Sequence, residues 1–373
     1  MRLRRAIVSL LIPLSAAWLT AVSRGALAQE TAPPTVSLPS EAELVDQIKK
    51  LRGDKGDHSR LSDAATKRDN SGALLDAVDA LLDRFPQSEF KEQALLTKLE
   101  TLSRLAQTRS EYVGRLLELT ESVAKVNPKG ELASENAYFA VQAFVLGARL
   151  EEMPENRRLL GTLERYKAFV DDYPDSPRRP VIWASLIRNL LALKQVDRAQ
   201  YELGVMHAGY PDHAATRRAA GEFFRATAVG KPYPSRFELP DGQVVRTTDY
   251  LGKVLIVHFW ATWSRASLEG LPKLVALHNE YKDRGLRLIG VNVDNSPLMI
   301  EASLAKFNMP WPQVRNAKGF ESDEVIDSGV VTLPAFFVLG RDGIVRNTDP
   351  GDQLREVIEP LLAEAVQAPM PAP

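Results

Sequence analysis

One stretch in the second half of the chain decides which fold the sequence predicts. Residues 237–274 read FELPDGQVVRTTDYLGKVLIVHFWATWSRASLEGLPKL. Within it, Val254–Trp260 is an almost unbroken apolar run, which is typical of a strand buried on both faces of a sheet. The residues from Ser264 to about Arg284 read as a helix in which Pro272 introduces a kink. A buried strand followed directly by a helix predicts an α/β domain.

Strand and helix signals alternate over the remainder of residues 235–365. Further elements are expected, in chain order, at Leu286–Asp294 (strand), Pro297–Phe307 (helix), Ala335–Leu339 and Ile344–Arg346 (strands), and Asp352–Ala365 (helix). The last two strands flank Arg341-Asp342-Gly343, which is typical of a hairpin turn. A change of composition near Gly230, rich in proline and glycine, places a domain boundary before this part of the chain.

Residues 41–228 show a different pattern, with apolar residues three and four positions apart, which predicts an all-α domain. Four residues precede a proline at intervals of about 40 residues, as in helical repeats: Phe85, Asn127, Tyr173 and Tyr210. Proline pushes the preceding residue out of the α region, so we expect a helix to end at each. Asp or Ser is expected to cap the next helix, and the aromatic residue to pack back between helices. Such units stack as an α-solenoid, and residues 173–213 resemble tetratricopeptide-type repeats, although the usual glycine is absent.

A family resemblance covers roughly the last third of the chain. The stretch quoted first, LIGVNVD at 288–294 and VVTLPAFFVLGRDGIV at 330–345 together resemble the TlpA/ResA-like thioredoxins, also grouped as redoxin or AhpC/TSA-type domains. The resemblance implies a thioredoxin-like α/β domain over residues 229–366, with a central mixed sheet flanked by helices.

The resemblance also implies an envelope reductase with a Trp-Cys-x-x-Cys site. In such an enzyme the first thiolate attacks a substrate disulfide and the second cysteine resolves the mixed disulfide. Here the site reads Trp263-Ser264-Arg265-Ala266-Ser267, and the chain contains no cysteine. Because a serine hydroxyl does not form the mixed disulfide, the catalytic assignment does not carry over. Ser264 and Ser267 are degenerate redox positions, and no catalytic residue is assigned.

Ser264 has two interpretations. It is well placed as an N-cap, whose oxygen accepts from the first turn of the helix and stabilises it by about 1 kcal/mol. The alternative is a serine nucleophile, which needs a base within reach. His278 is too far along the same helix. His258, where many thioredoxins hold a buried acid, lies closer but lacks an evident acid partner.

A peptide groove without redox chemistry is a second candidate site. By resemblance, Pro334 matches the family's cis-proline, which together with the tryptophan of the redox turn receives extended substrate backbone. Trp260, Trp263, Leu333 and Pro334 are the groove residues expected on this basis. The alternative is that Trp260 belongs to the core, that Trp263 merely covers the turn, and that Pro334 simply begins a strand.

Composition and motifs exclude several other functions. The formal net charge is −1, which does not suggest a nucleic-acid partner. No glycine-rich phosphate loop follows a strand, so no cofactor is expected. The five histidines, His58, His207, His213, His258 and His278, lack metal-ligand spacing, and Asp294 reads as a strand-end cap. No metal site is therefore expected.

The N-terminal segment predicts export. Residues 1–28 combine a basic start, an apolar run and Ala26-Leu27-Ala28 before Gln29, which is typical of a cleaved signal peptide. An uncleaved anchor is the alternative; after cleavage no membrane span is expected. Residues 29–40 read as a flexible linker and 367–373 as a disordered tail. The periplasm or cell envelope is the expected location.

Three functions follow from these observations. The favoured one is a redox-inactive module of the cell envelope that binds a protein or peptide, or acts as a scaffold. The second is a thiol-disulfide oxidoreductase or antioxidant protein by descent, with a changed or lost activity. The third is a C-terminal domain that serves as a structural cap on the helical domain.

Overall fold

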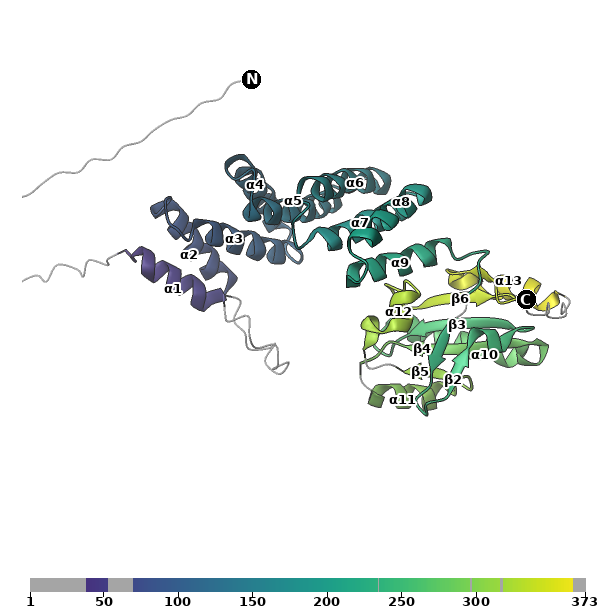
Figure 1. The fold of residues 1–373 in the computed structure, drawn as a ribbon. Coiled ribbons are helices and arrows are strands. Elements are labelled where there is room, and N and C mark those ends of the chain that lie inside the picture. The colour runs from purple at the N-terminus through teal and green to yellow at the C-terminus, as the bar shows by residue number, and fades with distance from the viewer. Residues whose placement is uncertain (1–37, 53–69, 234, 296, 316–317, 365–373) are drawn as a thin grey trace, which may run out of the picture.

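The computed structural model describes residues 38–52, 70–233, 235–295, 297–315 and 318–364. The expected signal peptide and tail, and all of the expected linker except its last three residues, lie outside these ranges. An all-α region follows an extended path, and an α/β domain lies beside its last helix (Figure 1). The fold class expected from the sequence is therefore confirmed.

The all-α region consists of helices joined mostly by short turns. In chain order they are α1 (Glu41–Arg52), α2 (Ser71–Arg84), α3 (Lys91–Ala106), α4 (Glu111–Val126), α5 (Glu131–Leu150), α6 (Glu155–Asp172), α7 (Arg179–Ala192), α8 (Val196–Gly209) and α9 (Ala214–Thr227). Each helix packs against the next, and α3 also contacts α5, as α7 contacts α9. This stacking fits a helical-repeat region.

The residues before the four prolines end helices as expected. Phe85, Asn127, Tyr173 and Tyr210 are the C-caps of α2, α4, α6 and α8, with φ from −140° to −123° and ψ from 57° to 72°. These angles lie outside the α region, which a following proline disfavours for the residue before it. The three aromatic members also pack against the hydrophobic clusters of this region, so both predictions are confirmed.

The prediction that Asp or Ser caps the following helix was wrong. The N-cap residues of α3, α7 and α9 are Phe90, Arg178 and His213. The hydroxyls of Ser88 and Ser176 instead accept hydrogen bonds from the backbone N–H two residues later, at 3.1 and 3.3 Å. A serine hydroxyl can stabilise a turn as well as a helix start, and here the turn uses it.

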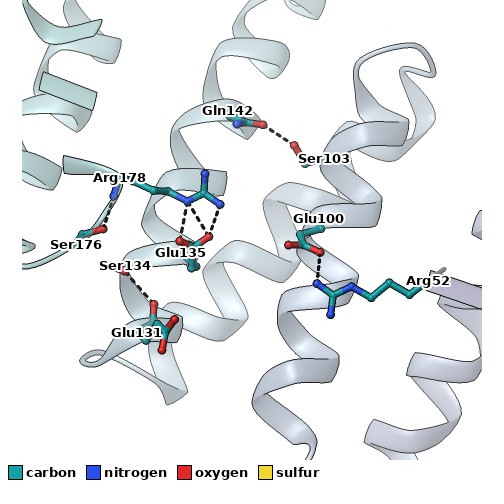
Figure 2. Close-up of polar contacts among 9 residues, drawn as sticks. All are labelled: Arg52, Glu100, Ser103, Glu131, Ser134, Glu135, Gln142, Ser176 and Arg178. Carbon is teal, nitrogen blue, oxygen red and sulfur yellow. Dashed lines mark hydrogen bonds and ion pairs between the residues drawn. The ribbon is translucent and has the colours of Figure 1, made fainter. Parts of the chain in front are cut away.

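Polar contacts connect alternate helices of this region (Figure 2). Arg52 of α1 pairs with Glu100 of α3 at 3.0 Å, and Ser103 of α3 donates to Gln142 of α5. The guanidinium of Arg178 forms two bonds from Nε to the carboxylate of Glu135 on α5, at 2.7 and 2.8 Å. Helices α1, α3 and α5 are thus joined in one layer, and Arg178 holds the start of α7 against α5.

The α/β domain is built on a five-stranded mixed sheet. Its strands and helices, in chain order, are β3 (Val254–Trp260), α10 (Arg265–Tyr281), β4 (Leu286–Asn292), α11 (Pro297–Phe307), β5 (Gln313–Arg315), α12 (Asp323–Asp327), β6 (Ala335–Leu339), β7 (Val345–Asn347) and α13 (Leu354–Ala363). The strand order is β5-β4-β3-β6-β7, in which β4 is parallel to β3 and to β5, and β6 is antiparallel to β3 and to β7. A separate hairpin of β1 (Arg236–Glu238) and β2 (Val244–Arg246) precedes the sheet.

The central strand separates two hydrophobic layers. Every residue of β3 is buried. Leu255, Val257 and Phe259 face one cluster, while Val254 and Ile256 face another that includes residues of α10 and α13. Alternation of side chains along the strand explains this division, and burial on both faces explains why the run has no polar interruption other than His258.

Helix α9 contributes side chains to the cores of both regions. Ala215 and Ala219 belong to the cluster of the all-α region. Phe224 stacks on Tyr233 and Phe337, at ring-centroid distances of 5.8 and 6.1 Å, in the core of the α/β domain. The helix is therefore part of both hydrophobic cores.

The contact between α9 and the α/β domain is close at the backbone. A methyl group added at Gly221 would lie 1.9 Å from the carbonyl oxygen of Ile326, at α12. Beside this contact, the Arg217 guanidinium bonds to Asp323 and Asp327, and Arg218 pairs with Glu321. These bonds hold the segment around α12 against α9.

The guanidinium of Arg225 completes this interface. It is mostly buried, and its Nη2 and Nη1 donate to the carbonyl oxygens of Thr348 and Phe336 at 2.6 and 3.3 Å. Burial lowers the pKa of Arg225. The guanidinium N–H groups therefore take the place of water as hydrogen-bond donors to two backbone carbonyl groups near the edge of the sheet.

Candidate functional site

The candidate site lies where β3 ends and α10 begins. Trp260 is the last residue of β3, and Ser264 is the N-cap of α10. The Oγ of Ser264 accepts a hydrogen bond from the Ser267 N–H at 3.3 Å and from the Ser267 hydroxyl at 3.0 Å. The N-cap interpretation of Ser264 is confirmed. At the two positions where the resemblance implies cysteines, the chain therefore has two serine hydroxyls that are hydrogen-bonded to each other.

Neither nearby histidine acts as a base for this serine pair. His258 is buried, its ring stacks on Phe336 at 4.8 Å, and burial lowers its pKa to about 3. His278 lies in the last turn of α10 and contacts Trp311 instead. In the described part of the chain, no hydrogen bond joins either imidazole to the serines. The arrangement gives no support to a serine nucleophile, which requires such a bond.

Asp294 fixes the loop that carries Trp263. Its carboxylate accepts from the backbone N–H and the hydroxyl of Thr262, at 2.9 and 2.7 Å, and from the amide of Asn292 at 2.7 Å. Asp294 follows β4, so the strand-end interpretation is correct, but its bonds reach across to the loop after β3. The sequence could have indicated this role only through the expectation that β3 and β4 are parallel neighbours, because the carboxyl ends of parallel strands lie at the same edge of a sheet.

Three of the four expected groove residues lie around this loop. The Leu333–Pro334 peptide bond is cis. Phe259 pairs with Ala335 in the β3–β6 register, which brings Pro334 beside the end of β3. Trp263 is 60% exposed, although its side chain is large and apolar. The cis bond expected by resemblance is thus present, next to an exposed tryptophan.

Trp260 does not belong to this surface. Its side chain has no exposed area, packs with Leu271 and Ile300, and donates from Nε1 to the Gln313 side chain at 3.1 Å. Strand alternation explains the difference, because Trp260 continues β3 whereas Trp263 lies in the loop beyond it. Trp260 is a core residue, and its expected place in the groove is corrected.

Two residues that the sequence did not indicate extend the exposed surface. Phe320 contacts Trp263, with ring centroids 6.1 Å apart, and Val331 is 53% exposed shortly before the cis bond. Both belong to the stretch between β5 and β6 that α9 holds through Arg217 and Arg218. We call Trp263, Phe320, Val331, Leu333 and Pro334 the Trp263 surface.

The other three histidines give no indication of a metal site. The Nδ1 of His213 accepts from the Ala215 N–H at 3.0 Å and so caps α9. His207 lies in the last turn of α8, and His58 is outside the described residues. Across residues 38–52, 70–233 and the described parts of 235–364, no group of three or more His, Cys, Asp or Glu side chains is arranged to hold a metal ion.

Comparisons with known proteins match the α/β domain. The model of the AhpC/TSA family matches residues 229–348. A thiol-disulfide oxidoreductase ResA from Geobacillus thermodenitrificans is 31% identical over 137 residues, which are 36% of this chain and 76% of that protein. This chain belongs to the AhpC/TSA family of thioredoxin-like proteins.

Two further proteins match a similar share of this chain. The ResA of Bacillus thuringiensis is 27% identical over 137 residues, again 36% of this chain and 76% of that protein. The thioredoxin domain of a thiol-disulfide oxidoreductase from Bacteroides vulgatus has 24% identity and a TM-score of 0.33, and the match covers 36% of this chain and 98% of that one. This AhpC/TSA chain differs from the family's thiol chemistry in having no cysteine.

None of the helices described for this family member could cross a membrane, because none is both long and apolar enough.

Proposed function

We propose that this chain is a redox-inactive, thioredoxin-like protein of the cell envelope that binds an extended protein or peptide segment at the Trp263 surface. The observation that carries the proposal is the combination of a hydroxyl pair at the sulfur positions with an exposed Trp263 beside the cis Leu333–Pro334 bond. An exposed tryptophan held by a rigid loop has the large, amphipathic contact area common in binding hot spots.

The surface offers both apolar area and free backbone. Trp263, Phe320 and Val331 supply apolar contacts, while the residues around Pro334 precede β6 and can pair with an extended chain. Thr262 and Asp294 keep the tryptophan loop in one conformation, so little conformational entropy is lost on binding. The stacked helices of the all-α region offer a second surface, and two sites on one chain raise avidity.

Binding is tested with a carboxymethylated, permanently unfolded polypeptide as the probe. Trp263→Ala should weaken its binding about tenfold or more, measured by fluorescence anisotropy. Tyr201→Ala is the comparison variant for the all-α region, because Tyr201 is 70% exposed on α8, and a loss of affinity in this variant alone would place binding on the helices instead. Equal affinity in parent and both variants would remove the Trp263 surface as the binding site.

The absence of redox turnover is tested separately. The purified protein should not reduce insulin disulfides, because neither Ser264 nor Ser267 can form a mixed disulfide. Ser264→Cys with Ser267→Cys places two thiols at the N-terminus of α10 and should restore measurable exchange. Turnover by the parent protein would contradict the proposal and favour an activity retained by descent.

The envelope location rests on the sequence of residues 1–28. Expression in a bacterial host followed by fractionation should recover the protein in the periplasm, with Gln29 as its first residue on N-terminal sequencing. Recovery in the cytosol with the leader intact would contradict export.

A structural role of the α/β domain is favoured by a separate observation. Phe224 and Arg225 of α9 are partly buried and contact that domain. Removing residues 230–373 should therefore lower the melting temperature of the all-α region, measured by circular dichroism. An unchanged melting temperature would exclude the capping role without affecting peptide binding.

A further inference from the structure

A cavity of the α/β domain lies at the end of the sheet opposite the Trp263 surface. It has a volume of about 420 Å³ and is open to solvent. Its walls come from Tyr250 before β3, His278 and Lys282 at the end of α10, Arg287 on β4, and Trp311 between two prolines before β5. Since β3 and β4 are parallel and both begin here, this cavity is separated from Ser264 by the length of a strand.

The charged groups around the cavity are mainly cationic. Lys282 and Arg287 face it together with a single acid, Asp283, and among the described residues no ion pair is formed by these three. The Nη1 of Arg287 donates to the carbonyl oxygens of Lys282 and Leu286 at 2.7 and 2.8 Å, which fixes the guanidinium at the rim. The remaining donors of the guanidinium have no protein acceptor in the described structure.

The back wall contains two ring nitrogens without protein partners. The Nε1 of Trp311 and the Nδ1 of His278 are buried and make no hydrogen bond within the described structure. Trp311 is only 5% exposed, and its ring meets that of His278 at 5.3 Å and 60°. Trp311 and His278 therefore give the cavity a largely aromatic back wall.

The electrostatic surroundings of His278 agree with a cationic site. Burial, and then the charges of Lys282 and Arg287, lower the pKa of this imidazole, while the neighbouring Asn279 side chain opposes them. An anion placed among the three groups would offset the two cations and raise that pKa. Its binding would therefore strengthen as the pH falls through the pKa of His278.

We propose that this cavity binds a small organic anion, with a carboxylate or phosphate group at Lys282 and Arg287 and a flat apolar body against Trp311 and Tyr250. Aromatic walls combined with a few oriented donors are typical of small-molecule sites, and the volume falls in their usual range. The proposal does not depend on peptide binding at the Trp263 surface, since the two sites share no residue.

The test uses the full mature chain and three probes: phenyl phosphate, inorganic phosphate and neutral benzyl alcohol. Binding is followed by the indole N–H resonance of Trp311, assigned with Trp311→Phe. Phenyl phosphate should shift this resonance saturably and raise the pKa of His278 in an NMR titration. Inorganic phosphate should bind more weakly, because it lacks the apolar body, and benzyl alcohol should not saturate the site.

Variants locate the anion. Lys282→Gln with Arg287→Gln should weaken phenyl phosphate about tenfold or more. Lys282→Gln alone should give a smaller loss of affinity. Because this side chain is exposed, the single variant should fold normally, so the test does not depend on the folding of the double variant. Lys273→Gln, on the same helix but outside the cavity, is the matched control. The proposal is overturned by no saturable shift, by equal affinity in the double variant, or by equal binding of benzyl alcohol.

Discussion

Replacing Gly221 with alanine is the sharpest test of how the two regions are joined. In an ordinary exposed helix this change is stabilising, because alanine is favoured over glycine by about 1 kcal/mol. At Gly221 the added methyl would lie 1.9 Å from the Ile326 carbonyl oxygen and 3.1 Å from the Gly329 nitrogen. Both neighbours are backbone atoms, so no side chain can rotate away. Helix α9 must instead move from α12 by roughly 1.5 Å to restore van der Waals contact.

This movement determines the size of the effect. Overpacking of a close contact costs about 1–3 kcal/mol, and the displacement also loosens Phe224, one turn further along α9. We expect Gly221→Ala to lower the free energy of unfolding by about 1–3 kcal/mol despite its better helix propensity. Gly204→Ala in α8, where an added methyl meets nothing within 4 Å, should raise it by about 0.5–1 kcal/mol.

The assay is equilibrium urea unfolding of both variants and the parent, followed by far-UV circular dichroism and by tryptophan fluorescence. The two substitutions share their chemistry and differ only in their surroundings. Opposite signs would support the close approach of α9 to α12. If Gly221→Ala stabilised the protein as much as Gly204→Ala, the reasoning about this interface would be refuted.

Three further changes test other parts of the structure. Asp294→Ala should lower the free energy of unfolding by about 1–3 kcal/mol, because Thr262 and Asn292 lose their acceptor. It should also increase the quenching of Trp263 fluorescence by acrylamide. If the protein were destabilised but the quenching unchanged, Asp294 would stabilise the fold without fixing the Trp263 loop. His258 is held neutral by burial, with a pKa of about 3, so below pH 6.5 the unfolded state binds one more proton and stability falls by about 1.4 kcal/mol per pH unit. His258→Leu should remove this component from the pH dependence between 6.5 and 3, and an identical slope in urea titrations would contradict it. Arg225→Ala should lower the free energy of unfolding, measured by urea titration, by about 2 kcal/mol, since the carbonyls of Thr348 and Phe336 lose charged donors. A change within experimental error would mean that water hydrogen-bonds to these carbonyls at no cost.

Local patterns predicted the elements well where one physical effect dominates. Strands Val254–Trp260 and Ala335–Leu339 have the bounds expected from their apolar runs. Helices end at the residues before proline, because the proline ring acts on its immediate neighbour whatever the tertiary structure. The N-caps were missed because several polar residues in each turn compete for the same backbone groups.

The candidate site was only partly predictable for a different reason. Ser264, Trp263 and Pro334 belong to short motifs that the sequence displays directly. Trp260 was misplaced because β3 ends at Trp260 itself, so its side chain is covered by the core, whereas Trp263, three residues further on, is exposed. Phe320 and Asp294 reach Trp263 and Thr262 from other elements, so their roles depend on pairings between distant segments that one sequence does not reveal.

The position of α9 in two hydrophobic clusters has a mechanical consequence. A force that pulls the ends of the chain apart must extract Phe224 from its aromatic stack and break the bonds of Arg225 before the junction opens. Tension would therefore not open the junction independently of the two cores that share α9. In a single-molecule pulling experiment, α9 and the sheet would extend together as one event.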